Sequence, residues 1–206
     1  MTSETQFQPN SNAEAATTDL SALRQQLLDL FCQLAYQEGD FVLSSGQRSS
    51  YYINGKQVTL HPQGALFIGR LLLAQLPIDT QAVAGLTLGA DPIVSAVSVV
   101  SAIENQPIPA LIVRKEAKGH GTRAYIEGPS LPDGASVVVL EDVVTTGQSA
   151  MKAVERLQQA GYKVQQVIAL VDRQQGGAQL YASSGLKFQT VFSIQDIQER
   201  WKQLQS

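Results

Sequence analysis

The feature that most constrains the fold is a regular alternation of two kinds of segment after Pro62. Short apolar segments rich in β-branched residues, typical of buried strands, alternate with longer segments whose apolar residues have helical spacing. Strands joined through helices lie parallel in one sheet that is covered on both faces. The pattern therefore predicts an α/β fold with a mainly parallel twisted sheet flanked by helices. The predicted strands are 82–86, 108–113, 136–144, 163–171 and 187–192, and the predicted helices are 64–76, 92–105, 148–160 and a last helix from about Ser193.

The N-terminal part has a different pattern. Leucines recur at helical spacing after Asp19, a suitable N-cap, until Gly39 interrupts them, which predicts a packing helix. Residues 41–61 combine Ser-Gly punctuation with short Tyr, Ile and Val pieces, which predicts a small hairpin. We therefore expect a single domain over 18–206, with a small N-terminal hood contributed mainly by 18–62.

Length and composition agree with one globular domain. The chain has 206 residues, of which 44% are hydrophobic, and a net charge of −3, and it has no apolar run long enough to cross a membrane. Residues 1–17 lack the basic start and apolar centre of a signal peptide, so we expect a disordered tail. Cys32 is the single cysteine, and its place among leucines predicts a buried thiol. These features predict a cytoplasmic protein that binds neither nucleic acid nor membrane.

The third strand of the predicted sheet ends in two adjacent carboxylates, Glu141 and Asp142. Ligands of open α/β sheets bind beyond the carboxyl ends of the strands, where this pair is expected. The turn 145–149 opens the next predicted helix, and a helix N-terminus with hydroxyl groups nearby suits a phosphate. The carboxylates can accept hydrogen bonds from sugar hydroxyls or hold a hard cation through water. A ribose phosphate satisfies both halves, and an ordinary capped turn is the alternative.

A second polar segment, RKEAKGHGTR, covers 114–123 and directly follows a predicted strand. It places five basic side chains close together in a protein that is acidic overall. A solvated surface loop is one interpretation. We favour a polyanion site because the positive charge is concentrated locally, and pyrophosphate is such an anion.

These segments resemble the motifs of a known family. The order of apolar strand, Glu-Asp, two valines, Thr-Thr-Gly and helix resembles the phosphoribosyl pyrophosphate (PRPP) motif of type I phosphoribosyltransferases. RKEAKGHG resembles the flexible catalytic loop of the orotate phosphoribosyltransferases, SGQRSSYYIN their N-terminal substrate segment, and VDRQQGG a late strand end whose arginine contacts the orotate side. Together the four matches lie within residues 41–177 and indicate an orotate phosphoribosyltransferase.

The resemblance implies the type I phosphoribosyltransferase fold and a reversible, Mg²⁺-dependent reaction. The phosphoribosyl group of PRPP would pass to orotate, giving orotidine 5′-monophosphate and pyrophosphate in pyrimidine biosynthesis. The resemblance also implies a homodimer with shared active sites. Arg114, Lys118 and His120 would then serve the pyrophosphate of the neighbouring subunit and Lys115 that of its own chain. The metal would be held mainly by the substrate, with no direct protein ligand.

The family roles transfer to individual residues as follows. Lys118, His120 and Asp142 are the expected catalytic residues. The expected PRPP-binding residues are Arg114, Lys115, Lys118, His120, Glu141, Asp142, Val143, Val144, Thr145, Thr146, Gly147, Gln148 and Ser149. The expected orotate-binding residues are Thr145, Arg173, Tyr52 and Ile53.

Some of these assignments have alternatives. Arg173 could instead form a salt bridge with Asp172 or Glu155, and Tyr51 and Tyr52 could equally be core aromatics. The chain also departs from the family pattern, because Ser44 and Gly89 stand where many members have lysines. Gly89 and Asp91 suggest a backbone anion site with a metal or water contact in compensation.

Two other functions are compatible with the same fold. A purine phosphoribosyltransferase would accept hypoxanthine or adenine and reject orotate. A regulator that senses PRPP while binding DNA would show salt-sensitive DNA binding. The acidic composition and the intact basic segment argue against the regulator.

Overall fold

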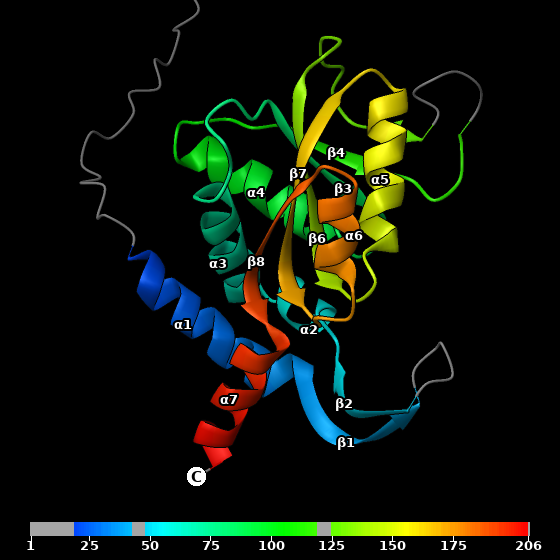
Figure 1. Ribbon diagram of the computed structural model, residues 1–206. Coiled ribbons are helices and arrows are strands. Elements are labelled where there is room, and N and C mark those ends of the chain that lie inside the picture. The colour runs from blue at the N-terminus through cyan, green and yellow to red at the C-terminus, as the bar shows by residue number, and fades with distance from the viewer. Residues whose placement is uncertain (1–18, 43–47, 119–124, 206) are drawn as a thin grey trace, which may run out of the picture.

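The main sheet of the protein is parallel apart from one short edge strand. The structure, a computed structural model, describes residues 19–42, 48–118 and 125–205 (Figure 1). The larger sheet has the order β5-β4-β3-β6-β7-β8, and β5 alone pairs antiparallel within it. The predicted α/β fold with a mainly parallel sheet is therefore confirmed. The strands are β3 (Ala82–Leu86), β4 (Ala110–Val113), β5 (Ile126–Glu127), β6 (Ser136–Val144), β7 (Lys163–Asp172) and β8 (Lys187–Ser193).

Helices cover both faces of this sheet, and each face has its own buried core. Side chains alternate between the faces along a strand, so Val138 and Leu140 of β6 enter one core while Val137 and Val139 enter the other. The first core is closed by α1, α3 and α4 and the second by α5 and α6 (Figure 1). The helices are α3 (Pro62–Leu73), α4 (Asp91–Ile103), α5 (Gln148–Gln159) and α6 (Gly177–Ser183).

The strand order reverses between the parallel neighbours β3 and β6, at the middle of the sheet. From β3 the chain crosses through α4 to β4 on one side, and from β6 it crosses through α5 to β7 on the other. The loops that leave these two neighbouring strands therefore diverge and leave a crevice at their carboxyl ends, where open α/β sheets bind ligands. The carboxylate pair at the end of β6 lies at this switch point.

The N-terminal segment forms a separate hairpin and helix beside the sheet. Helix α1 (Leu20–Leu30) begins at Asp19, whose Oδ1 accepts hydrogen bonds from the N–H groups of Ser21 at 2.9 Å and Ala22 at 3.1 Å, which confirms the predicted N-cap. A π-helical turn follows. The remaining elements of this part are the π-helix η1 (Phe31–Ala35), β1 (Tyr36–Val42), β2 (Arg48–Ile53), α2 (Lys56–Thr59) and the C-terminal α7 (Ile194–Gln205).

The expectation that the first helix runs as far as Gly39 is wrong. The chain becomes extended at Tyr36, and Gly39 lies inside β1, which pairs antiparallel with β2. The ring of Tyr36 is fully enclosed, with its centroid 5.9 Å from Tyr51 and 5.5 Å from Trp201. These partners come from distant parts of the sequence, so tertiary packing, and not local propensity, ends the helix.

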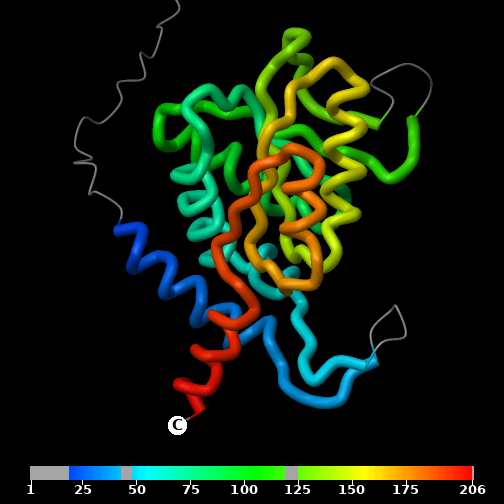
Figure 2. The backbone as a smooth tube through the Cα atoms, in the orientation of Figure 1, coloured from blue at the N-terminus to red at the C-terminus, as the bar shows by residue number. Residues whose placement is uncertain are grey.

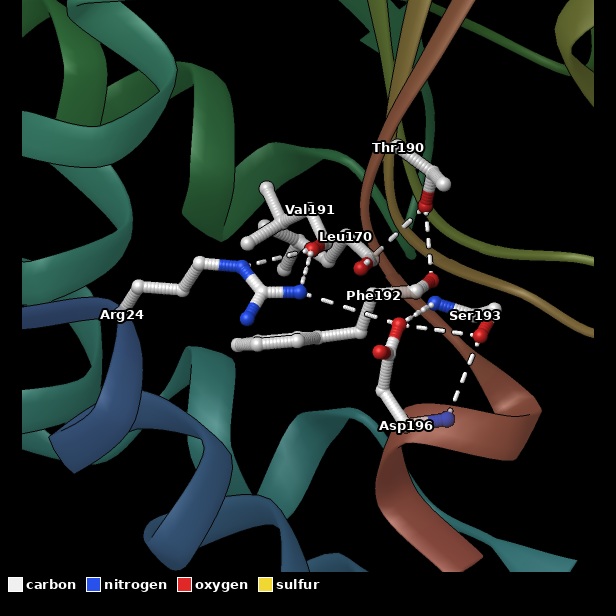
Figure 3. Close-up of polar contacts among 7 residues, drawn as sticks. All are labelled: Arg24, Leu170, Thr190, Val191, Phe192, Ser193 and Asp196. Carbon is white, nitrogen blue, oxygen red and sulfur yellow. Dashed lines mark hydrogen bonds and ion pairs between the residues drawn. The ribbon is translucent and has the colours of Figure 1, made fainter. Parts of the chain in front are cut away.

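Arg24 ties α1 to the edge of the main sheet (Figure 3). Its Nε and Nη2 donate hydrogen bonds to the carbonyl oxygen of Val191 at 3.3 and 3.1 Å, and its guanidinium lies 4.8 Å from the ring centre of Phe192. Asp196 faces the same guanidinium at 3.7 Å and also accepts the N–H of Ser193 at 2.7 Å, which caps α7. Consequently α1 and α7 lie side by side (Figure 2).

The short elements α2, α6 and β5 were not predicted from the sequence. Helix α6 occupies a segment that reads as a glycine-containing loop, and β5 lies in the polar stretch before 134. A Cβ atom at Gly177 would lie 2.3 Å from Val144 Cγ1, so the glycine lets α6 pack directly against the end of β6. Within the described ranges, no helix is long and apolar enough to cross a membrane. The predicted tail, 1–17, lies outside the described residues.

Candidate active site

A cavity of about 280 Å³ lies at the switch point. Four parts of the chain meet there: the start of α2, the loop after β3, the residues after β4, and the end of β6 with the start of α5. The cavity is therefore assembled by the fold and not by one motif. Its lining residues are Lys56, Leu86, Thr87, Leu88, Gly89, Lys115, Glu141, Asp142, Val143 and Ser149.

Glu141 is a buried carboxyl group at the base of this cavity. Its side chain is 6% exposed, and its Oε2 atom has no hydrogen-bond partner among the described residues. Burial raises the pKa of Glu141 to about 9, and the neighbouring Asp142 adds to the shift through its charge and a hydrogen bond, whereas Lys56 opposes it. The Oε2 atom of Glu141 is therefore available for a hydrogen bond with a ligand.

Asp142 is better exposed to the cavity and is fixed by the backbone. Its Oδ1 accepts the N–H of Val143 at 2.9 Å. Gly89 lies directly against it, because a Cβ atom at that position would stand 2.8 Å from Asp142 Oδ1. A side chain at residue 89 would therefore displace the carboxylate, which gives a physical reason for the missing lysine in the loop after β3.

The turn after β6 forms a small concave surface of about 80 Å³. Gly147 has φ +83° at the N-terminus of α5, a conformation that favours glycine, and a Cβ atom there would lie 3.0 Å from the ring of Tyr181. Tyr181 is fully buried and its hydroxyl donates to the carbonyl oxygen of Gly147 at 3.3 Å. The turn is supported by α6 and leads into the N-terminus of α5, whose first N–H groups suit a phosphate. Its lining residues are Glu141, Val143, Val144, Thr145, Thr146, Gly147, Gln148, Ser149 and Tyr181.

The described basic residues after β4 lie in different surroundings. Lys115 lines the cavity with the carboxylate pair. Arg114 and Lys118 instead face Glu127, with nitrogen–oxygen distances of 3.0 and 3.7 Å. His120 and Arg123 lie outside the described residues. Three of the expected PRPP-binding cations, Arg114, Lys115 and Lys118, are described by the structure. Among these three, Lys115 lines the cavity of its own chain.

Arg173 follows β7 and lies beside the end of β6, because its backbone N–H bonds to the carbonyl oxygen of Val144 at 2.9 Å. It does not form the salt bridge with Asp172 or Glu155 that the sequence left open. Its Nε donates to Tyr51 Oη at 3.1 Å, and the guanidinium lies 4.9 Å from the centre of that ring. The backbone of Arg173 is thereby held at Val144, the residue before Thr145.

The tyrosine pair of β2 has one buried and one exposed member. Tyr51 is 9% exposed and belongs to the core, as one of the alternatives held. Tyr52 is 43% exposed and its ring lies 5.7 Å from that of Phe41. Ile53 packs partly buried against the first core. Neither Tyr52 nor Ile53 lines the cavities formed by the described residues around the carboxylate pair.

The donor atoms fit a hard metal ion that is held mainly through a substrate. The described residues contain no cluster of three or more His, Cys, Asp or Glu side chains suited to a metal. Glu141 and Asp142 nevertheless direct hard oxygen atoms into the cavity, which suit Mg²⁺ bound through water or sugar hydroxyls. Asp91, the other carboxylate nearby, accepts the hydroxyl of Thr87 at 2.7 Å and leaves its Oδ1 buried without a partner.

Sequence reasoning missed three residues of the site. Lys56 lines the cavity and was not considered, although it directly follows the Tyr-Tyr-Ile-Asn-Gly segment. Tyr51 orients Arg173, and Tyr181 supports the turn before α5. The last two act through contacts between distant segments, which no local signal announces.

A turn at a helix N-terminus that suits a phosphate lies beside a carboxylate pair that suits sugar hydroxyls, with Lys56 and Lys115 lining the same cavity. This is the arrangement expected of a phosphoribosyltransferase. In agreement, the family model described as uracil phosphoribosyltransferase matches residues 93–196. The match to this model covers the main sheet from α4 onwards.

Full-length relatives define the family more narrowly. An orotate phosphoribosyltransferase from Nostoc sp. is 74% identical over 204 residues, which is 99% of this chain and 99% of that protein. The crystal structure of orotate phosphoribosyltransferase from Mycobacterium tuberculosis has a TM-score of 0.77 at 38% identity and covers 85% of this chain and 98% of that one. A structure of the M. tuberculosis enzyme in complex with PRPP has a TM-score of 0.72 at 35% identity, with the same coverage. The chain belongs to the orotate phosphoribosyltransferase family, enzymes of the glycosyltransferase class.

Proposed function

We propose that this chain catalyses the reversible, Mg²⁺-dependent transfer of the phosphoribosyl group from PRPP to a ring nitrogen of orotate. The products are orotidine 5′-monophosphate and pyrophosphate, in the biosynthesis of pyrimidine nucleotides. The main support for this proposal is the cavity at the switch point. There Glu141 and Asp142 adjoin the turn 145–149 and share the cavity lining with Lys56 and Lys115. We also propose that the protein is cytoplasmic.

The parts of the site have separate roles toward PRPP. The turn 145–149 binds the 5′-phosphate through the N–H groups at the start of α5 and its hydroxyl groups. Asp142 and Glu141 accept hydrogen bonds from the ribose hydroxyls and fix the sugar beneath the leaving group. Glu141 and Asp142 would help to hold a Mg²⁺ ion through water or the sugar hydroxyls, and the ion would supply charge neutralisation on the pyrophosphate. Lys115 and Lys56 add positive charge to the lining of the cavity.

The reaction breaks the bond between the anomeric carbon and pyrophosphate and forms a bond from that carbon to the orotate nitrogen. Positive charge develops on the ribose and negative charge on the leaving group, so fixed charges around both accelerate the step. Lys118 and His120 complete the cationic surroundings of pyrophosphate. Arg173 binds the carboxylate of orotate with its terminal nitrogens while Tyr51 holds its Nε, and Thr145 contacts the base from the adjoining turn.

We also propose a homodimer with shared sites. Arg114 and Lys118 lie against Glu127 in their own chain and not in the cavity, which suits residues that serve the site of a partner. Tyr52 and Ile53 stay assigned to the orotate side, and the exposure of the Tyr52 ring leaves it open to contact.

The test is a direct assay of the acceptor base. Orotate consumption is followed by its ultraviolet absorbance with PRPP and Mg²⁺, and parallel reactions replace orotate by uracil, hypoxanthine or adenine. We expect turnover of orotate and little or none of the other bases. Turnover of uracil by a protein that does not turn over orotate would refute the proposal. Uracil is included because the matching family model is described as uracil phosphoribosyltransferase.

A further inference from the structure

Arg156 contacts both described ends of the basic segment that runs from Arg114 to Tyr125. It projects from α5, and its Nη1 and Nη2 donate hydrogen bonds to the carbonyl oxygens of Arg114 and Lys115, the second at 2.8 Å. The same guanidinium lies over the ring of Tyr125, 4.2 Å from its centre. The side chain of Arg156 therefore contacts the segment both where it leaves the sheet after β4 and where it returns before β5.

The two ends are also joined to each other at this place. The N–H of Arg114 donates to the carbonyl oxygen of Tyr125 at 2.8 Å. A planar guanidinium can donate to two carbonyl oxygens from its fixed fork of N–H groups while its flat face stacks on an aromatic ring, a geometry that an ammonium group does not offer. The chemistry of arginine is thus matched to three contacts that lie in different directions.

Helix α5 connects these contacts to the proposed PRPP site. Its first turn carries Ser149, and Arg156 stands on the same face about two turns later. Lys115 lines the cavity with the carboxylate pair and also the neighbouring cavity of about 480 Å³ that Arg156 lines. Lys115 therefore lies between the two cavities, together with Leu86 and Ser149, and its carbonyl oxygen is held by Arg156.

We propose that Arg156 is a positioning residue, which holds both ends of the 114–125 segment against α5 and thereby fixes Lys115 at the edge of the PRPP cavity. The inference rests on the proposed function for its kinetic consequence, but the contact itself is independent of it. The competing explanation is electrostatic: Arg156 would then act only as one more positive charge beside the cavity.

Amide hydrogen exchange of the ligand-free protein tests the contact without any assay of activity. Arg156→Ala should speed exchange of the Arg114 amide by about tenfold or more, because its bond to Tyr125 loses its support. Lys152→Ala is the matched control, since Lys152 is an exposed cation on the same helix that lines the same cavity. It should leave this amide unchanged, and Arg156→Lys should give an intermediate rate. Unchanged exchange in Arg156→Ala overturns the inference.

Kinetics then test whether the contact acts through Lys115. Arg156→Ala should lower kcat/KM for PRPP by about 10-fold or more, the loss expected for charged hydrogen bonds, and Lys152→Ala should change it less than about twofold. In a protein that already carries Lys115→Ala, adding Arg156→Ala should lower kcat/KM for PRPP by less than about threefold. Three results would each contradict the positioning role and support a purely electrostatic role of Arg156. They are an equal loss of kcat/KM with and without Lys115→Ala, full activity of Arg156→Lys, and equal effects of Arg156→Ala and Lys152→Ala. A wild-type protein inactive on orotate would refute the proposed function, and hydrogen exchange would still decide the inference.

Discussion

Replacing Glu141 by glutamine should stabilise the ligand-free protein at alkaline pH and leave its stability at acid pH nearly unchanged. The pKa of Glu141 is raised from an ordinary value of 4.5 to about 9 in the folded protein, mainly by burial. Between these two values the folded chain binds a proton at this site that the unfolded chain has lost. Stability therefore falls as pH rises through this window, and the loss is complete above the folded pKa.

The size of the effect follows from the shift. One pKa unit corresponds to about 1.4 kcal/mol, so the full shift gives an upper bound of about 6 kcal/mol. Water entry and local relaxation reduce such penalties in proteins, and we expect on the order of 2–3 kcal/mol at pH 9. Glutamine has the same shape and no charge, so it avoids this penalty. With about 2–4 °C for each kcal/mol in a chain of this size, the Tm of Glu141→Gln should exceed that of the wild type by about 5–10 °C at pH 9.

The assay is thermal unfolding of both proteins without ligands from pH 5 to 9.5. The difference in Tm between them isolates Glu141, because every other group titrates in both. Glu199→Gln is the control, since it makes the same chemical change on an exposed face of α7; its difference from the wild type should not vary with pH. A Tm difference for Glu141→Gln that is the same at pH 5 and pH 9 would refute the argument from burial.

Three further predictions concern the proposed site. Asp142→Asn should weaken PRPP binding by about tenfold or more, measured by calorimetry, and leave Tm nearly unchanged because asparagine keeps the acceptor for the N–H of Val143; a large fall in Tm would make Asp142 a structural residue. Lys56→Met should raise the KM for PRPP by about tenfold while the KM for orotate changes less than twofold; equal changes would place Lys56 elsewhere in the mechanism. Lys118→Ala and Asp142→Asn subunits should each be nearly inactive, yet random mixing should restore roughly a quarter of wild-type activity if sites are shared; no recovery despite proven subunit exchange would place Lys118 in its own chain's site.

Much of the fold could be predicted because local pattern and tertiary environment agree there. The strand 136–144 is apolar on both faces, as a central parallel strand must be, and it was placed at the boundaries that the structure has. Helix α5 begins at 148 as predicted, since Gly147 is the residue that its left-handed N-terminus favours. Where distant residues decide, prediction fails. The helix expected to reach Gly39 ends early because Tyr36 turns toward Trp201, and α6 was overlooked because its packing against Val144 is a property of the folded chain.

The same division holds for the site. The order of Glu141, Asp142 and the turn 145–149 predicts a phosphoribosyl site without the structure, because those groups are consecutive and their spacing is set by a strand and a helix start. Lys56 could be recognised as part of that site, and Gly89 as a neighbour of Asp142, only after folding, since each reaches the cavity across a gap of more than fifty residues in the sequence. Sequence determines which chemical groups a continuous segment presents. The tertiary structure decides which groups from other segments stand within reach of them, and so which charges the substrate meets.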